Sequence, residues 1–172
     1  NVVKAMGKIG GTAIKGFDKG KIGGGSKQYP SKIYKVVIGD NKAFDPTFMF
    51  EYGCHKVLFG ANYYSQYLPP SPCWLVWSKQ PDDVHLSFAD AELAWTDFTS
   101  PVRLYRHLWS GMLRAGAHKE EGKTRIHPTQ KPVGLMADII NDYSERGNII
   151  MDFYLGSGST LIAAQKTGRI CY

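Results

Sequence analysis

The chain has 172 residues, of which 43% are hydrophobic and 13% aromatic, a length and composition that suit one folded domain and exclude a disordered chain. No apolar run reaches the ~20 residues needed to cross a bilayer, and the first residues lack the apolar core of a secretory signal, so we expect a cytoplasmic protein. The three cysteines, Cys54, Cys73 and Cys171, are widely separated and form neither a metal-binding pattern nor a disulfide framework.

The net charge of +6 is concentrated in two segments of the chain. Residues 1–35 contain eight lysines and one acid, Asp18, which gives this segment +7 and leaves the remainder at −1. A second excess of +5 lies between Arg103 and Lys131. Two basic segments beside a near-neutral remainder favour contact with a polyanion such as a nucleic acid, although lysine-rich segments also serve solubility alone.

In chain order, the sequence predicts a basic loop followed by alternating strands and helices. Residues 1–35 combine their lysines with eight glycines and show no helical or strand period, which predicts a long mobile loop. Short helices are expected at 47–52 and 61–64, and strands at 56–60, 73–77, 92–96 and 102–106.

The second half of the chain gives a clearer pattern. We expect an irregular insertion over 109–126, a helix at 132–143, a strand at 148–151, a helix at 160–166 capped by Gly168, and a strand at 169–172. Continuous apolar strands that alternate with helices imply an α/β domain with a mainly parallel sheet covered on both faces.

The turn between the strand at 148–151 and the next helix has the composition of a ligand site. Gly156 and Gly158 lack Cβ atoms, so a ligand can approach the backbone closely, and Asp152 offers an acceptor at the end of the strand. Hydroxyl side chains follow at a helix N-terminus, where N–H groups lack intrahelical partners; they are Ser157, Ser159 and Thr160. The segment matches neither GxxxxGK[ST] nor GxGxxG, so alone it fits an ordinary capped turn equally well.

A second motif, His127-Pro128-Thr129-Gln130-Lys131-Pro132, lies one helix and one strand upstream of this turn. Together the two segments resemble the DNA amino-methyltransferases of the N6-adenine/N4-cytosine family. In that family a Thr-Gln-Lys-Pro segment opens a helix, an Asp-Pro-Phe-x-Gly-Ser-Gly-Thr turn follows later, and both bind S-adenosylmethionine. This sequence departs from the pattern at Phe153, which replaces the usual proline.

The resemblance implies a Rossmann-like, S-adenosylmethionine-dependent methyltransferase domain over residues 36–172. Within it, residues of about 100–126 would form a recognition region that contacts DNA, and 127–172 would form the cofactor-binding part. The implied cofactor-binding residues are Thr129, Gln130, Lys131, Asp152, Phe153, Gly156, Ser157, Gly158, Ser159 and Thr160. The implied DNA-binding residues are Arg103, Arg106, Arg114, Lys119, Lys123 and Arg125. Lys131 also fits an ordinary surface lysine at a helix start.

Weaker similarities extend the resemblance toward the N-terminus. Residues 59–64 are similar to the family's Gly-Gly-Asn-Tyr/Phe segment, and 75–79 are similar to a strand whose Trp-x-Lys end lines the active-site cleft. The tryptophans involved, Trp77 and Trp95, also suit an ordinary core or wall.

The amine-binding Asp/Ser/Asn-Pro-Pro-Tyr/Phe tetrapeptide of the family is not found in residues 1–172. Neither Asp45-Pro46-Thr47-Phe48 nor Leu68-Pro69-Pro70-Ser71 fits it, so no catalytic residue is assigned. In the family's permuted order the tetrapeptide should lie just before Asn1, and we expect the chain to be a fragment. The resemblance implies methyl transfer to an exocyclic amine of a DNA base, with adenine N6 the expected target. The alternatives are an N4-cytosine enzyme, a non-catalytic nucleic-acid-binding relative and a different nucleotide-binding Rossmann protein.

Overall fold

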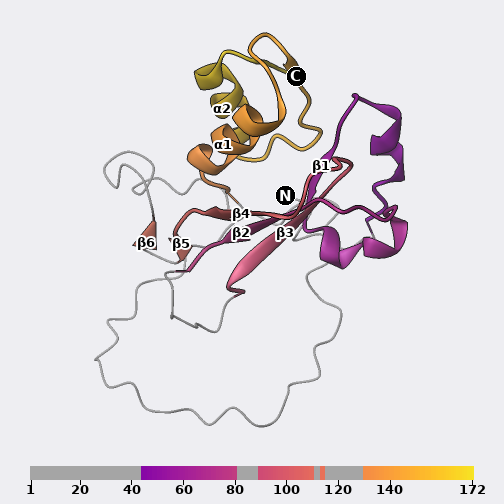
Figure 1. Cartoon of the computed structure of the whole chain (residues 1–172). Helices are drawn as coiled ribbons and strands as arrows, with labels where there is room; N and C mark the ends of the chain where they lie inside the picture. Colours follow the sequence, from indigo (N-terminus) through magenta and orange to yellow (C-terminus); the bar gives the residue numbers. More distant parts are fainter. Residues whose placement is uncertain (1–43, 81–88, 111–112, 115–129) are drawn as a thin grey trace, which may run out of the picture.

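The structure is a computed structural model that describes residues 44–80, 89–110, 113–114 and 130–172 (Figure 1). The loop expected at 1–35 and most of the expected insertion lie outside the described residues. Within the described residues, no helix has both the length and the apolar character needed to span a membrane.

A four-stranded sheet forms the centre of the described part, with the strand order β1-β3-β2-β4. Its strands are β1 (Val57–Phe59), β2 (Trp74–Ser78), β3 (Ala91–Thr96) and β4 (Arg103–Arg106). All four were expected from the apolar runs, but β3 runs antiparallel to β1 and β2, and only the β2–β4 pair is parallel. The sheet is therefore mixed, and a mainly parallel arrangement is not confirmed. An apolar run has the same composition in either chain direction, so its presence in the sequence predicts a strand and not the direction in which that strand pairs.

A second, parallel pair of strands follows later in the chain. It consists of β7 (Ile149–Ile150) and β8 (Ile170–Cys171), which pair in register Ile149 with Ile170. Helix α2 (Ser159–Thr167) connects the two strands, so this part forms the expected strand–helix–strand unit. Gly168 ends α2 with a left-handed φ of 76°, as expected for a cap.

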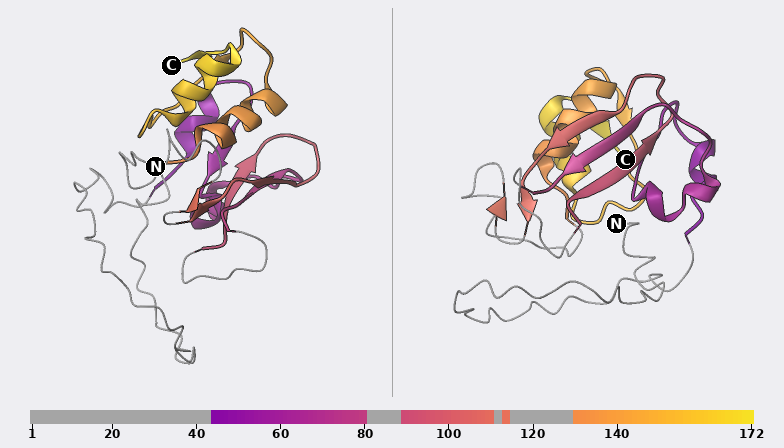
Figure 2. Two further views of the ribbon diagram at one scale, coloured as in Figure 1. Left: turned by 90° about the vertical axis from the view of Figure 1, so that its left-hand side faces the viewer. Right: turned by 60° about the horizontal axis from the view of Figure 1, so that its bottom comes forward.

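Helix α1 (Val133–Tyr143) joins the two sheets through opposite sides of its surface. Leu135 and Ile139 pack into a core with the sheet residues Leu75 and Trp77, whereas other α1 residues pack against Ala163 and Ala164 of α2. Figures 1 and 2 show α1 and α2 on the same side of the four-stranded sheet. Apolar residues at helical spacing thus predicted α1 to within one residue, because both sides of this helix are buried.

Short elements complete the described chain. The helices expected at 47–52 and 61–64 are 3-10 helices: η2 (Thr47–Glu51), η3 (Ala61–Tyr63) and the adjoining η4 (Ser65–Tyr67). A two-stranded hairpin, β5 (Trp109–Ser110) with β6 (Leu113–Arg114), lies where an irregular insertion was expected. This hairpin contains too few residues to produce a recognisable alternation in the sequence.

Both tryptophans that had two interpretations belong to the core. Trp77 and Trp95 are each 2% exposed. Their indole N–H groups donate to main-chain carbonyls, Trp77 to His107 and Trp95 to Pro69, both at 2.9 Å. With their polar atoms satisfied inside the protein, they act as walls that position the strand ends rather than as exposed platforms.

Candidate functional site

The glycine-rich turn between β7 and α2 has a backbone that few other residues could adopt. Gly156 and Gly158 have positive φ angles of 56° and 74°, and Leu155 between the strand and the glycines has a φ of 40°. A positive φ is unfavourable for a residue with a Cβ, so Leu155 is held in place by its surroundings. At Gly158 a Cβ would find no atom within 4 Å, so the space beside this glycine is open.

Asp152 holds the first half of this turn together. Its Oδ1 accepts hydrogen bonds from the main-chain N–H groups of Tyr154 at 3.1 Å and Leu155 at 3.0 Å. Its own N–H donates to the carbonyl of Tyr172 at 2.8 Å, which anchors the end of β7 to β8. The carboxylate therefore has a fixed position at the exit of the strand, where it also lines a cleft.

Ser159 links the turn to the upstream motif. Its Oγ donates to the main-chain carbonyl of Lys131 at 2.7 Å and lies 2.9 Å from the Oγ of Ser157. Ser159 is only 6% exposed, so this bond is largely shielded from water. The two segments that the resemblance associates with one cofactor are thus in direct contact.

The side chain of Lys131 is partly buried and lies against the end of β1. Its Nζ lies 4.8 Å from the centre of the Phe59 ring, at the end of β1. Burial lowers the pKa of Lys131, while the carboxylates of Glu92 and Asp152 oppose the shift. The ammonium of Lys131 therefore lies against the end of β1, beside the carboxylates of Glu92 and Asp152.

Lys79, which follows β2, and Glu92 on β3 form an ion pair near Lys131. Both side chains of this pair are 19% exposed, and the Lys79 ammonium also lies 5.0 Å from the centre of the Trp77 ring. Charged groups from three strands therefore lie close together beside the glycine-rich turn: Lys79 after β2, Glu92 on β3 and Asp152 after β7.

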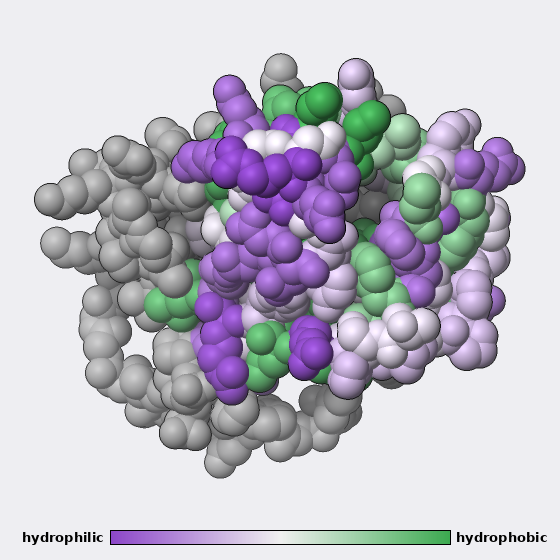
Figure 3. Space-filling model, turned by 45° about the horizontal axis from the view of Figure 1, so that its top comes forward, coloured by the Kyte–Doolittle hydropathy of each residue, from purple (hydrophilic) through white to green (hydrophobic). Residues whose placement is uncertain are grey.

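A cleft of about 850 Å³ runs between β1 and β7. Its polar lining includes five of the residues expected to bind a cofactor: Lys131, Asp152, Ser157, Ser159 and Thr160. Its apolar lining includes residues of α1 and β7, and Ile149 on β7 is 64% exposed. The face seen in Figure 3 shows apolar residues, in green, beside a hollow. The volume and the mixed lining suit a nucleoside-sized ligand.

Aromatic side chains from the segment before β1 pack against the turn, a contact that the sequence did not suggest. Phe153 lies edge-on to Phe48 and Tyr52, with ring centres 5.5 and 5.4 Å apart, and Tyr154 lies 6.0 Å from Phe44. The spacing of Phe44, Phe48 and Tyr52, four residues apart, was the available signal. Phe153, at the position where proline was expected, uses its ring to hold this segment.

The expected DNA-binding residues are only partly described. Arg103 and Arg106 are exposed on β4, at the opposite edge of the sheet from β1. The backbone of Arg114 lies on β6, whereas Lys119, Lys123, Arg125 and the cofactor-motif residue Thr129 lie outside the described residues. The structure therefore does not bring the arginines of β4 and the cofactor-motif residues into one cleft.

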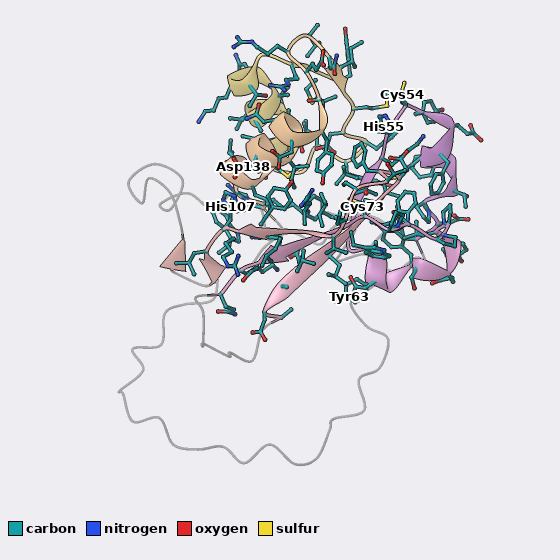
Figure 4. The ribbon with its side chains drawn as sticks, in the orientation of Figure 1. Cys54, His55, Tyr63, Cys73, His107 and Asp138 are labelled. Carbon is teal, nitrogen blue, oxygen red and sulfur yellow. The ribbon has the colours of Figure 1, made fainter. Side chains whose placement is uncertain are left out.

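The chain after β4 is attached to α1 by a polar contact. His107 Nε2 lies 2.8 Å from Asp138 Oδ2, and Figure 4 shows the two side chains facing each other. Because α1 begins next to Lys131, this contact connects the start of the expected recognition region to the cofactor-motif helix. Among the described residues, no three His, Cys, Asp or Glu side chains gather as a metal site would require.

Comparison with known proteins identifies relatives of one class. Residues 77–172 match the family model for N6/N4 methyltransferases, described as DNA methylase. The type II methyltransferase M2.DpnII of Streptococcus pneumoniae is 39% identical over 64 residues, which cover 37% of this chain and 23% of that protein.

Two further relatives match over a longer stretch. The type II methyltransferases M2.LlaDCHI of Lactococcus lactis subsp. cremoris and M2.MboI of Moraxella bovis are 29% and 28% identical over 108 residues, which cover 63% of this chain. The matched part corresponds to 38% and 37% of their respective lengths. The chain thus spans well under half the length of the curated relatives it matches.

Proposed function

The chain belongs to the N6/N4 DNA methylase family. We propose that it carries the cofactor-binding part of an S-adenosylmethionine-dependent enzyme that methylates an exocyclic amine in DNA. The observation that carries the proposal is the hydrogen bond from Ser159 to Lys131, because it joins both cofactor motifs at the wall of one cleft. Adenine N6 is the proposed target and cytosine N4 the alternative; the proposed location is the cytoplasm.

The residues of the cleft suit the charged methionine portion of the cofactor. Asp152 offers a fixed carboxylate for an ammonium group, and the open side of Gly158 gives access to the N-terminus of α2, which favours a carboxylate. Thr129 and Gln130 would approach the same portion from the segment before α1. Phe153 and the neighbouring rings would shield it from water.

The bound cofactor supplies an electrophilic methyl group on a positively charged sulfur. The task of the protein is to hold the target amine in line with that methyl group, with the base turned out of the DNA duplex. The fixed turn at 152–158 and the cleft wall formed by Phe59 would provide this alignment. Arg103 and Arg106 would contact phosphates, which position DNA without reading its sequence.

The proposal includes a Rossmann-like arrangement of the whole domain over residues 36–172. Its support is the parallel β7–α2–β8 unit and the position of the glycine turn at the carboxyl end of β7. Among the described strands, β1 pairs only with β3 and β7 only with β8, so each faces the cleft with an unpaired edge. A further strand in this cleft would join both sheets into one.

Binding and transfer can be tested separately on the full-length protein. S-adenosylmethionine should raise its melting temperature, and incubation with tritiated cofactor should transfer label to DNA. The absence of any thermal shift would overturn the proposed cofactor site. Cofactor binding with no label in DNA would instead favour the non-catalytic relative, and the methylated nucleoside would distinguish adenine from cytosine.

A further inference from the structure

The cleft contains a cation beside the carboxylate that is proposed to hold the cofactor. Lys131 and Asp152 both line the cleft, and their charges interact. The Lys131 ammonium lies 4.8 Å from the centre of the Phe59 ring, and its main-chain carbonyl is fixed by the Ser159 hydroxyl. The ammonium is therefore part of the site wall.

Three charged side chains of the described residues interact with Lys131. Glu92 on β3 and Asp152 after β7 are negative, whereas Lys79 after β2 is positive and paired with Glu92. With Lys131 included, these four groups have no net charge. S-adenosylmethionine carries a positive sulfur and one net positive charge, whereas its demethylated product, S-adenosylhomocysteine, carries a neutral sulfur and none. Binding of S-adenosylmethionine therefore makes the total charge of these four groups and the ligand positive, whereas binding of S-adenosylhomocysteine leaves the total at zero.

We propose that Lys131 determines the preference of the site between donor and product by penalising the positive sulfur; this inference rests on the proposed function. Three carbons separate the ammonium nitrogen of the ligand from its sulfur. A ligand held by Asp152 through its ammonium therefore places the sulfur close enough to Lys131 for their charges to interact.

The expected effect is large enough to measure. Two unit charges roughly 8 Å apart at an effective dielectric constant of ~20 repel with an energy that corresponds to about a thirtyfold change in affinity. Screening by salt and water in an open cleft reduces this to roughly tenfold. The ligand ammonium and carboxylate are common to donor and product, so the ratio of their dissociation constants isolates the sulfur charge.

The test is calorimetric titration of the full-length protein with each ligand, in the wild type and in Lys131→Met. The ratio of the donor's Kd to the product's Kd should fall about tenfold in Lys131→Met, because the repulsion between the ammonium and the positive sulfur is lost. Lys131→Arg keeps the charge and should keep the ratio, as should Lys166→Met, which removes an exposed lysine in the last turn of α2. An unchanged ratio in Lys131→Met overturns the inference.

The pH dependence of the wild type gives a second readout that does not depend on how well a variant folds. Lys131 is charged at low pH, and its lowered pKa means that it loses its charge at a lower pH than an ordinary lysine. The ratio should therefore fall as pH rises in the wild type and fall less in Lys131→Met. Identical pH profiles overturn this inference alone, whereas failure of the wild type to bind either ligand overturns the proposed function as well.

Discussion

The hydroxyl of Ser159 donates a 2.7 Å hydrogen bond to the main-chain carbonyl of Lys131, 28 residues earlier in the chain. Ser159 opens α2 and Lys131 precedes α1, so the bond joins the starts of both helices. Because Ser159 is nearly buried, water does not readily replace its hydroxyl. The glycine-rich turn at the start of α2 and the segment before α1 are consequently held as one unit.

Ser159→Ala should lower the free energy of unfolding by about 1–3 kcal/mol, because it leaves the carbonyl of Lys131 without its partner in a shielded position. Binding of S-adenosylmethionine should weaken as well, since the two motifs lose their connection. Urea denaturation and calorimetric titration measure the two effects. Thr167→Ala is the matched control, because the Thr167 hydroxyl bonds to carbonyls of its own helix. Equal losses of cofactor affinity in both variants would contradict the role of Ser159.

Asp152→Asn should separate the structural role of Asp152 from its charge. Asparagine keeps an oxygen that can accept from the N–H groups of Tyr154 and Leu155, so the turn and the melting temperature should change little. The loss of the charge should weaken S-adenosylmethionine binding by about tenfold, the size of one charge-assisted hydrogen bond. Asp152→Ala removes both roles and should also lower the melting temperature. Unchanged affinity in Asp152→Asn would show that the ligand ammonium is not held there.

Thiol labelling should report the electrostatics of the strand next to the site. Cys54 is exposed and should react with iodoacetamide first, whereas Cys73, which is 0% exposed, should react last in the folded protein. Burial and the charge of Asp152 raise the pKa of the Cys171 thiol, so its labelling rate should keep rising at pH values above the ordinary thiol pKa of ~8.5.

Asp152→Asn is the decisive variant for this experiment. Removing the negative charge lowers the pKa of Cys171, which increases its thiolate fraction and its labelling rate at a fixed pH of about 8. Mass spectrometry of labelled peptides follows each cysteine separately. A labelling rate for Cys171 that does not respond to Asp152→Asn would rule out this coupling.

Two glycine substitutions should change stability in opposite directions. Gly168→Ala places a Cβ on a residue with φ of 76° and 3.1 Å from the Arg146 guanidinium, so it should destabilise by about 1–2 kcal/mol. Gly134→Ala lies inside α1, where its Cβ meets the His107 ring at an ordinary 3.4 Å, and it should stabilise by roughly 0.5–1 kcal/mol. Thermal and urea denaturation test both, and a loss of stability in Gly134→Ala would mean that α1 has no room beside His107.

Removal of Arg103 and Arg106 together should weaken DNA binding without affecting S-adenosylmethionine binding, because the two arginines lie on β4, away from the cleft. If each contacts one phosphate, the slope of log Kobs against log salt should become less negative by about 1 per arginine. Arg146→Ala, an exposed arginine after α1, is the control. A double variant with the affinity and salt slope of the wild type would exclude β4 from the DNA interface.

The sequence predicted local structure more completely than it predicted pairing. Helix α1 was predicted to within one residue, because Val133, Leu135 and Ile139 follow a helical period that burial imposes. The antiparallel position of β3 was not predicted, since an apolar run such as 92–96 has the same composition in either direction. Strand order depends on contacts between distant segments, which local periodicity does not contain.

In the candidate site, too, the local motifs were predicted, whereas the contacts between distant segments were not. The two cofactor motifs were associated through a family resemblance, and the structure brings Lys131 and Ser159 into contact. The ion pair of Lys79 with Glu92 was not predicted, because it forms only once β2 and β3 lie side by side. Phe48 and Tyr52 were missed for a related reason: they contact Phe153 across about a hundred residues of sequence.

Among the described strands, β1 and β7 each have one edge without a partner, and these edges bear on how the chain behaves in solution. Each edge presents main-chain donors and acceptors beside the apolar lining of the cleft. This arrangement can pair with strands of other molecules. At high protein concentration the open edges beside the cleft should favour strand exchange between copies of the chain, and then aggregation. Coverage of these two edges by another strand should therefore reduce self-association of the chain.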